Sequence, residues 1–218
     1  RAQCLDFRIG FVDRVQELSA KMEMVLAAAE EVRRSPNFLK ALDCTLALGN
    51  YLNGTSNKGA AWGFKLDSLG KLGGTKTGDN SSTLLHYMAK LLEKDDIAAK
   101  LTSEMADLEG AARTVWKDET SDLSALKASL KQVETQVKLD KIEAFTKSMG
   151  AFAQGSAKQM EQLVAEQAEA DENCKELKKL FGEDAKTEPE DVFSTLHNFV
   201  LTFQKAHKYN REQELRKK

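Results

Sequence analysis

Apolar residues recur every three or four positions through most of this 218-residue chain, which is the spacing that lines one face of an α-helix. No segment shows the strict alternation of apolar and polar residues that marks a half-buried strand. Proline, which disrupts helix interiors and central strands, occurs only at positions 36 and 189. The pattern therefore predicts an all-α fold.

Local signals delimit the first two helices. Apolar residues at 11, 15, 18, 22, 25, 29 and 32 predict a helix from about Leu5 to Arg34. A second helix is expected to begin with Ser35 as its N-cap and Pro36 in its first turn, and to end at the Asn53-Gly54 turn. Its inner face is predicted to hold Leu39, Leu42, Leu46 and Gly49.

The middle of the chain carries the longest apolar repeat. A short helix with Ser81 or Ser82 as its cap is expected to run to about Lys94. From Leu101 to Val137 the apolar spacing is close to 3.5 residues, the seam of a coiled-coil-like helix. The register breaks between Leu139 and Lys141, and a new stripe continues to Phe181. We therefore expect an elongated helical bundle with a long antiparallel coiled-coil-like hairpin.

A final helix is predicted after a glycine stop. Gly182 is typical of a helix C-terminus, and Thr187-Glu188-Pro189-Glu190 has the pattern of a capping box with proline in the first turn. The apolar face that follows holds Val192, Phe193, Leu196, Phe199 and Phe203. The charged tail from Lys208 to Lys218 is expected to fray.

One segment, residues 49–87, departs from this regularity, and we call it the signature segment. Glycines and polar residues there form two loops on either side of a short apolar turn, and loops held by a rigid scaffold are common binding sites. Residues 49–92 contain five lysines, at 58, 65, 71, 76 and 90, and a net charge of +3, although the whole chain has a net charge of −2. This local charge indicates either a solvated face or a surface suited to an acidic partner.

The sequence argues against an enzyme and against resident cofactors. Gly73-Gly74-Thr75-Lys76-Thr77 lacks the spacing of a phosphate-binding loop and follows an apolar helical turn rather than a strand. No catalytic or metal-binding motif organises the histidines and three cysteines, and we interpret His86 as structural and the thiols as reduced. No apolar run approaches the ~20 residues that span a bilayer, and the charge does not point to nucleic acid.

The signature segment resembles the formin homology 2 domain. The resemblance rests on Gly49-Asn50-Tyr51-Leu52-Asn53, Gly63-Phe64-Lys65-Leu66, Lys71-Leu72, Thr75-Lys76-Thr77 and Thr83-Leu84-Leu85-His86-Tyr87, in this order. Phe7 to Phe11 and the segment from Asp191 to Phe199 resemble other parts of that domain more loosely. The resemblance divides the chain into a knob remainder with entry helices (1–48), the post signature (49–100), a coiled-coil hairpin (101–181) and a closing post helix with tail (187–218).

This resemblance implies a non-enzymatic role on actin. Domains of this family nucleate actin filaments and follow their barbed ends as head-to-tail dimers, in which a lasso of one subunit seats on the post of the other. It implies actin contacts at Lys76, with Lys71, Lys65 and Lys58 extending the patch, and a lasso-binding dimer surface at Gly49, Asn50, Tyr51, Asn53, Gly63 and Phe64. The resemblance further implies that profilin-actin binds indirectly, through regions outside these residues. It also implies a location in the cytoplasm, at the cytoskeleton.

Two further expectations follow from the resemblance. A complete domain of this family begins with the lasso, a linker and the front of the knob, so we expect the chain to be a fragment that is impaired alone. The alternative is a structural coiled-coil scaffold without an actin role, which would depend on the hairpin only.

Overall fold

The computed structural model describes residues 1–54, 60–78 and 80–217, and the chain divides into two compact units. Unit 1 comprises Arg1–Leu26 and Thr114–Asn173, and unit 2 comprises Ala27–Arg113 and Cys174–Lys218. Helices α1 (Ala2–Arg34) and α8 (Glu143–Leu180) contribute residues to both units. The described residues contain helices and one isolated β-bridge but no strand, which confirms the all-α prediction.

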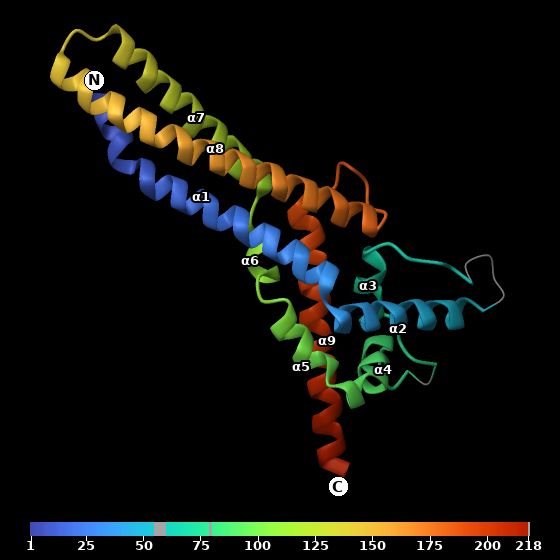
Figure 1. Cartoon of the computed structure of the whole chain (residues 1–218). Helices are drawn as coiled ribbons and strands as arrows, with labels where there is room; N and C mark the ends of the chain where they lie inside the picture. The colour runs from blue at the N-terminus through green and yellow to red at the C-terminus, as the bar shows by residue number, and fades with distance from the viewer. Residues whose placement is uncertain (55–59, 79, 218) are drawn as a thin grey trace. The chain divides into compact units, whose positions relative to one another are not determined.

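Unit 1 is built from α7 (Trp116–Leu139), most of α8 and the first part of α1 (Figure 1). The heptad spacing puts Leu123, Leu126, Leu130 and Val133 of α7 in the core, together with Met149, Ala153, Met160 and Leu163 of α8. The predicted hairpin, with its turn after Leu139, is confirmed. The α1 helix joins the hairpin through Phe7 and Phe11, whose rings lie 6.2 and 5.4 Å from that of Phe152.

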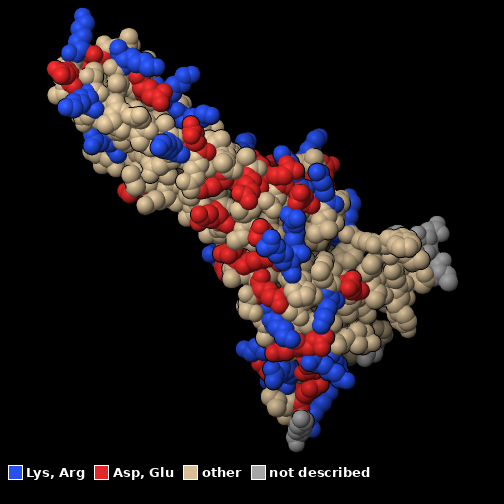
Figure 2. Space-filling view, viewed as in Figure 1, with Lys and Arg blue, Asp and Glu red and all other residues tan. Residues whose placement is uncertain are grey.

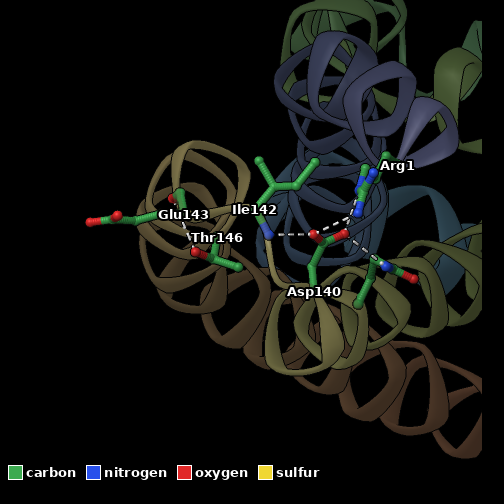
Figure 3. Close-up of polar contacts among 6 residues, drawn as sticks. Arg1, Asp140, Ile142, Glu143 and Thr146 are labelled. Atoms are coloured by element: carbon green, nitrogen blue, oxygen red, sulfur yellow. Dashed lines mark hydrogen bonds and ion pairs between the residues drawn. The ribbon is translucent and has the colours of Figure 1, made fainter.

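Asp140 closes the hairpin turn (Figure 3). Its carboxylate accepts two hydrogen bonds from the Arg1 guanidinium, at 2.6 and 2.9 Å, and one at 2.9 Å from the backbone N–H of Ile142. The Arg1 hydrogen bond, followed by that from Ile142, holds the pKa of Asp140 well below its usual range. The ionised carboxylate thus ties α1 to the turn from which α8 begins.

The predicted continuous helix from residue 101 is wrong, because the chain bends twice before α7. It forms α5 (Ile97–Glu104) and α6 (Leu108–Arg113) first. The carboxylate of Glu31 on α1 accepts hydrogen bonds from the backbone N–H groups of Ala106 and Asp107, at 3.2 and 3.1 Å. Glu31 therefore satisfies donors that an unbroken helix would have paired internally, and α5 and α6 pack on another helix, α9 (Pro189–Lys217).

Helix α9 is the centre of unit 2. It packs against α3 (Asp67–Leu72), α4 (Leu84–Leu91), α5 and α6 (Figure 1). All five residues of its predicted apolar face are buried. Phe38 is fully buried beside this face, with ring centroids 6.2 Å from Phe199 and 6.4 Å from Phe181. A short 3₁₀ helix, η1 (Glu93–Asp95), follows α4.

Helix α2 (Pro36–Asn53) begins as predicted, but its buried face differs from the prediction. The Ser35 hydroxyl accepts a hydrogen bond from the N–H of Phe38 at 2.9 Å, and Pro36 occupies the first turn. The buried residues are Asn37, Phe38, Ala41, Thr45 and Leu48, whereas Leu39 is 48% exposed. The predicted leucine face was wrong by about one residue. The helix is rotated so that Phe38, and not Leu39, packs against the aromatic rings in the core of unit 2.

The later helix ends show one confirmed and two corrected predictions. Gly182 adopts a φ of +63°, a conformation that suits glycine, and α8 ends two residues before it. Helix α9 starts at Pro189 and its first acceptor is the carbonyl of Glu188, so the N-cap lies one residue beyond the predicted Thr187. The tail is helical to Lys217 rather than frayed.

Candidate protein-docking site

The last turn of α2 carries the first part of the signature segment. Gly49 and Asn50 are half-buried, whereas Tyr51 is 84% and Leu52 55% exposed. The Asn50 side-chain amide donates to the backbone carbonyl of Ala61 at 3.0 Å and accepts from its N–H at 2.7 Å. Helix α2 then ends at Gly54, whose φ of +52° and ψ of −129° suit glycine. This turn therefore joins the chain beyond residue 60 to the end of α2.

Two small pockets lie on either side of this turn. The loop-side pocket, of about 320 Å³, is lined by residues that include Leu46, Asn50, Leu52, Ala61, Phe64 and Leu84. The α4-side pocket, of about 300 Å³, is lined by residues that include Leu48, Tyr51, Leu52, Leu84, Tyr87 and Leu91. Leu52 and Leu84 line both pockets, so the two form one continuous apolar surface.

Large apolar side chains stand exposed around these pockets. Trp62 is fully exposed, and Tyr87 and Leu91 are about half exposed. The part of unit 2 around the end of α2 shows few charged side chains, whereas the C-terminal part of α9 shows many of both signs (Figure 2). Contiguous exposed apolar surface of this kind is typical of protein-docking sites.

Lys76 lies on a short turn that hydrogen bonds hold in place. It forms an antiparallel bridge with Thr83, flanked by backbone bonds from Thr77 N–H to the Ser82 carbonyl and from Leu84 N–H to the Thr75 carbonyl. The side chain of Lys76 is exposed, and no ion pair involves it in the described parts of the chain, which exclude Asp79. The backbone at Lys76 is therefore held by its pairing with residues 82–84, and the side chain is exposed to solvent.

The other predicted lysines differ in their surroundings. Lys71, in the last turn of α3, pairs with Asp67 at 2.8 Å and also lines the loop-side pocket. Its hydrogen bond lowers the pKa of Asp67. Lys65 is exposed just before α3, and Lys58 lies outside the described residues.

The remaining predicted dimer-surface residues fall at the pocket or its rim. Gly63 and Phe64 line the loop-side pocket, as do Gly49 and Asn53. Phe64 is half-buried and Asn53 is exposed. The structure thus brings Gly49, Asn50, Asn53, Gly63 and Phe64 to one pocket and places Tyr51 in the other.

Residues distant in sequence support this surface, and the sequence patterns did not predict them. Glu183 accepts a hydrogen bond from the N–H of Leu66 at 3.1 Å, which fixes the start of α3 against the end of α8. His86 has the predicted structural role: its ring lies 2.7 Å from the hydroxyl of Thr83 and 5.0 Å from the Tyr209 ring. Helix α4 starts at Leu84 with Thr83 as its N-cap, so the predicted serine caps were wrong.

The segment around Lys76 differs from a phosphate-binding loop. The segment Gly73 to Thr77 follows helix α3, whereas a phosphate-binding loop follows a strand. Within residues 1–54, 60–78 and 80–217, no group of three or more His, Cys, Asp or Glu could hold a metal ion. In the same residues, no helix has both the length and the apolar character to cross a bilayer.

Comparison with known proteins identifies the family. A family model described as Formin Homology 2 Domain matches residues 1–204, which include unit 1, most of unit 2 and the whole signature segment. The chain belongs to this family.

Similar proteins come from distant organisms. The chain is 31% identical to Formin-F of Dictyostelium discoideum, 34% to Formin-like protein 13 of Arabidopsis thaliana and 32% to Protein diaphanous of Drosophila melanogaster. These alignments cover 98%, 98% and 96% of the chain but only 18%, 17% and 20% of the respective relatives. The chain therefore spans at most about a fifth of the length of these relatives.

Proposed function

We propose that this chain is the actin-binding part of a formin, which nucleates actin filaments and stays on their barbed ends during elongation, as a dimer. The observation that carries the proposal is the exposed apolar surface beside Lys76, within a formin homology 2 domain. The family match supports this function over a coiled-coil scaffold, because it extends beyond the α7–α8 hairpin to the signature segment.

The two kinds of surface take two kinds of partner in this proposal. The loop-side and α4-side pockets, whose volumes are about 320 and 300 Å³, receive bulky apolar side chains of a second subunit. Lys76, with Lys71, Lys65 and Lys58, contacts carboxylates on actin. Ammonium groups at the rim of an interface mainly steer association, and a desolvated one contributes more to affinity.

Nucleation then follows from geometry without any bond being made or broken. Small actin oligomers dissociate quickly because the entropy cost of association exceeds the gain from their few contacts. A dimer that holds two actin subunits side by side makes the second binding event intramolecular and raises the effective concentration. Alternate release of its two halves lets the dimer follow the growing end. No cofactor enters this cycle.

The same proposal places the protein in its cellular setting. We place it in the cytoplasm, at the actin cytoskeleton, and assign delivery of profilin-actin to regions of the protein outside these 218 residues. Nucleic acid and membrane are not partners in this scheme. The net charge of −2 offers neither of them a strong overall attraction.

Replacing Lys76 by aspartate in the full-length protein tests the proposal. We expect Lys76→Asp to abolish the acceleration of actin assembly in a fluorescence assay and to leave the helical circular dichroism unchanged. Lys117→Asp is the matched control, because Lys117 is also exposed but lies on α7, outside the signature segment. Assembly at the normal rate with Lys76→Asp would remove Lys76 from the actin contact, and a wild-type protein without assembly activity would favour the scaffold.

A further inference from the structure

We infer that Asn50 positions the docking site and does not itself bind the partner. Its side-chain amide holds Ala61 at the end of α2 and thereby builds one wall of the loop-side pocket. This inference rests on the proposed function, since it concerns how the dimer surface is prepared for a second copy of the protein.

The side-chain amide of Asn50 already makes two hydrogen bonds within the chain. One N–H donates to the Ala61 carbonyl and the oxygen accepts from the Ala61 N–H, which reproduces the paired bonds that two backbone segments make in an antiparallel ladder. Asn50 is half-buried, whereas Tyr51 and Asn53 in the same turn are exposed. The neighbours of Asn50, not Asn50 itself, are thus available to a partner.

The backbone next to Ala61 explains why such a clamp is needed. Ala60 has a φ of +56°, which is unfavourable for a non-glycine residue and persists only where the surroundings impose it. Ala61, Gly63 and Phe64 line the loop-side pocket, and Trp62 between them is fully exposed. Without the Asn50 bonds, this part of the chain would relax and the pocket would lose a wall.

A pocket that is formed in advance binds more tightly, because the ordering cost is met before the partner arrives. Loss of the clamp transfers that cost to the binding step. Ordering one residue lowers affinity by roughly tenfold, and ordering two lowers it by roughly a hundredfold. We therefore expect a dimer dissociation constant about 10- to 100-fold higher when the clamp is absent.

Three variants of the full-length protein test the inference. Asn50→Ala removes both bonds, Asn50→Asp keeps only the acceptor for the Ala61 N–H, and Asn53→Ala truncates an exposed asparagine of the same turn. The dissociation constant is measured by sedimentation over a dilution series. It should rise about 10- to 100-fold for Asn50→Ala and less for Asn50→Asp.

Hydrogen exchange at the Ala61 amide distinguishes positioning from direct contact. In the 218-residue chain, we expect Asn50→Ala to speed this exchange about 5- to 10-fold, the loss of one ordinary hydrogen bond, with Asn50→Asp and Asn53→Ala close to wild type. The melting temperatures should change little, because Asn50 lies at the end of α2. Weaker dimerisation with unchanged Ala61 exchange would make Asn50 a contact residue and overturn the inference.

Other outcomes are equally decisive. Faster Ala61 exchange with an unchanged dissociation constant would show that the clamp is irrelevant to docking, and a large fall in melting temperature would make Asn50 a general stabilising residue. A wild-type protein that does not self-associate would overturn both the dimer surface and this role. Failure of the actin proposal alone would appear separately, as lost assembly activity with intact self-association.

Discussion

The α7–α8 hairpin and the signature segment are held by different forces. In the hairpin, buried side chains repeat at heptad spacing, from Trp116 to Val133 on α7 and from Met149 to Leu177 on α8. In the signature segment, helices of six and eight residues are joined by turns that individual hydrogen bonds hold, such as those of Asn50 with Ala61 and of Thr77 with Ser82. The first region is stabilised by repetition and the second by particular contacts.

This difference separates stability from recognition. The hairpin uses its apolar side chains to hold its own helices together and to bind α1 through Phe152. The signature segment leaves Tyr51, Leu52 and Trp62 exposed, so these side chains contribute little to the folding stability of the isolated chain. Apolar surface that the fold does not use is available for a partner, which is why we place the docking site there.

The largest expected effect is on the core of unit 2. Phe38→Ala should lower the free energy of unfolding by about 3–5 kcal/mol, because it removes a fully buried ring from between Phe181 and Phe199. Trp62→Ala is the matched aromatic control and should cost less than about 0.5 kcal/mol, because Trp62 is exposed. Urea unfolding followed by circular dichroism measures both, and equal losses would contradict the separation of stability from recognition.

A smaller effect is expected where α8 ends. Gly182→Ala should destabilise the protein by about 1 kcal/mol, because a Cβ atom is disfavoured at a φ of +63°. Gly155→Ala on α8 is the opposite case, since an added Cβ would meet no atom within 4 Å and alanine favours helix. Gly155→Ala should therefore stabilise by a similar amount. Thermal unfolding of the two variants, compared with wild type, checks the signs.

The smallest effect concerns the turn of the hairpin and depends on pH. Because the pKa of Asp140 is lowered in the folded protein, its stabilising contribution is complete above the pKa of the unfolded chain, near 3.9. That contribution is lost as the pH falls toward the lower folded pKa. The stability difference between wild type and Asp140→Asn should therefore be present at pH 6 and shrink below about pH 4.

Asp6→Asn, which removes an exposed carboxylate from α1, serves as the control for the loss of one negative charge. If the difference in stability between wild type and Asp140→Asn stays constant from pH 6 to pH 2, the negative charge of Asp140 does not contribute to stability.

Much of the fold could be predicted from the sequence, because helical faces repeat. The spacing of apolar residues placed the turn after Leu139, and Ser35-Pro36 and Gly182 marked helix ends correctly. The patterns did not predict the breaks before α7, because the partner of those backbone groups is Glu31, about 75 residues earlier. The buried face of α2 was also missed, because Phe38 and Leu39 are equally apolar and only tertiary packing chooses between them.

The candidate site was predictable as a place but not as a geometry. The glycine-rich motif indicated where binding residues would gather, and the structure has two pockets and several exposed apolar side chains in this segment. The pairing of Asn50 with Ala61 and the support of Leu66 by Glu183 depend on contacts across 11 and 117 residues. Such pairs produce no periodic pattern in a single sequence, so the sequence does not predict the roles of these residues.

The most direct test of the account is whether the protein binds actin filaments through the signature segment. Co-sedimentation of the full-length protein with filaments, at low and at moderate ionic strength, measures this binding. We predict that wild type pellets with filaments, that added salt reduces the bound fraction by screening lysine contacts, and that Lys76→Asp pellets much less at both ionic strengths. Wild-type protein that stays in the supernatant throughout, or Lys76→Asp that pellets as wild type does, would contradict the account.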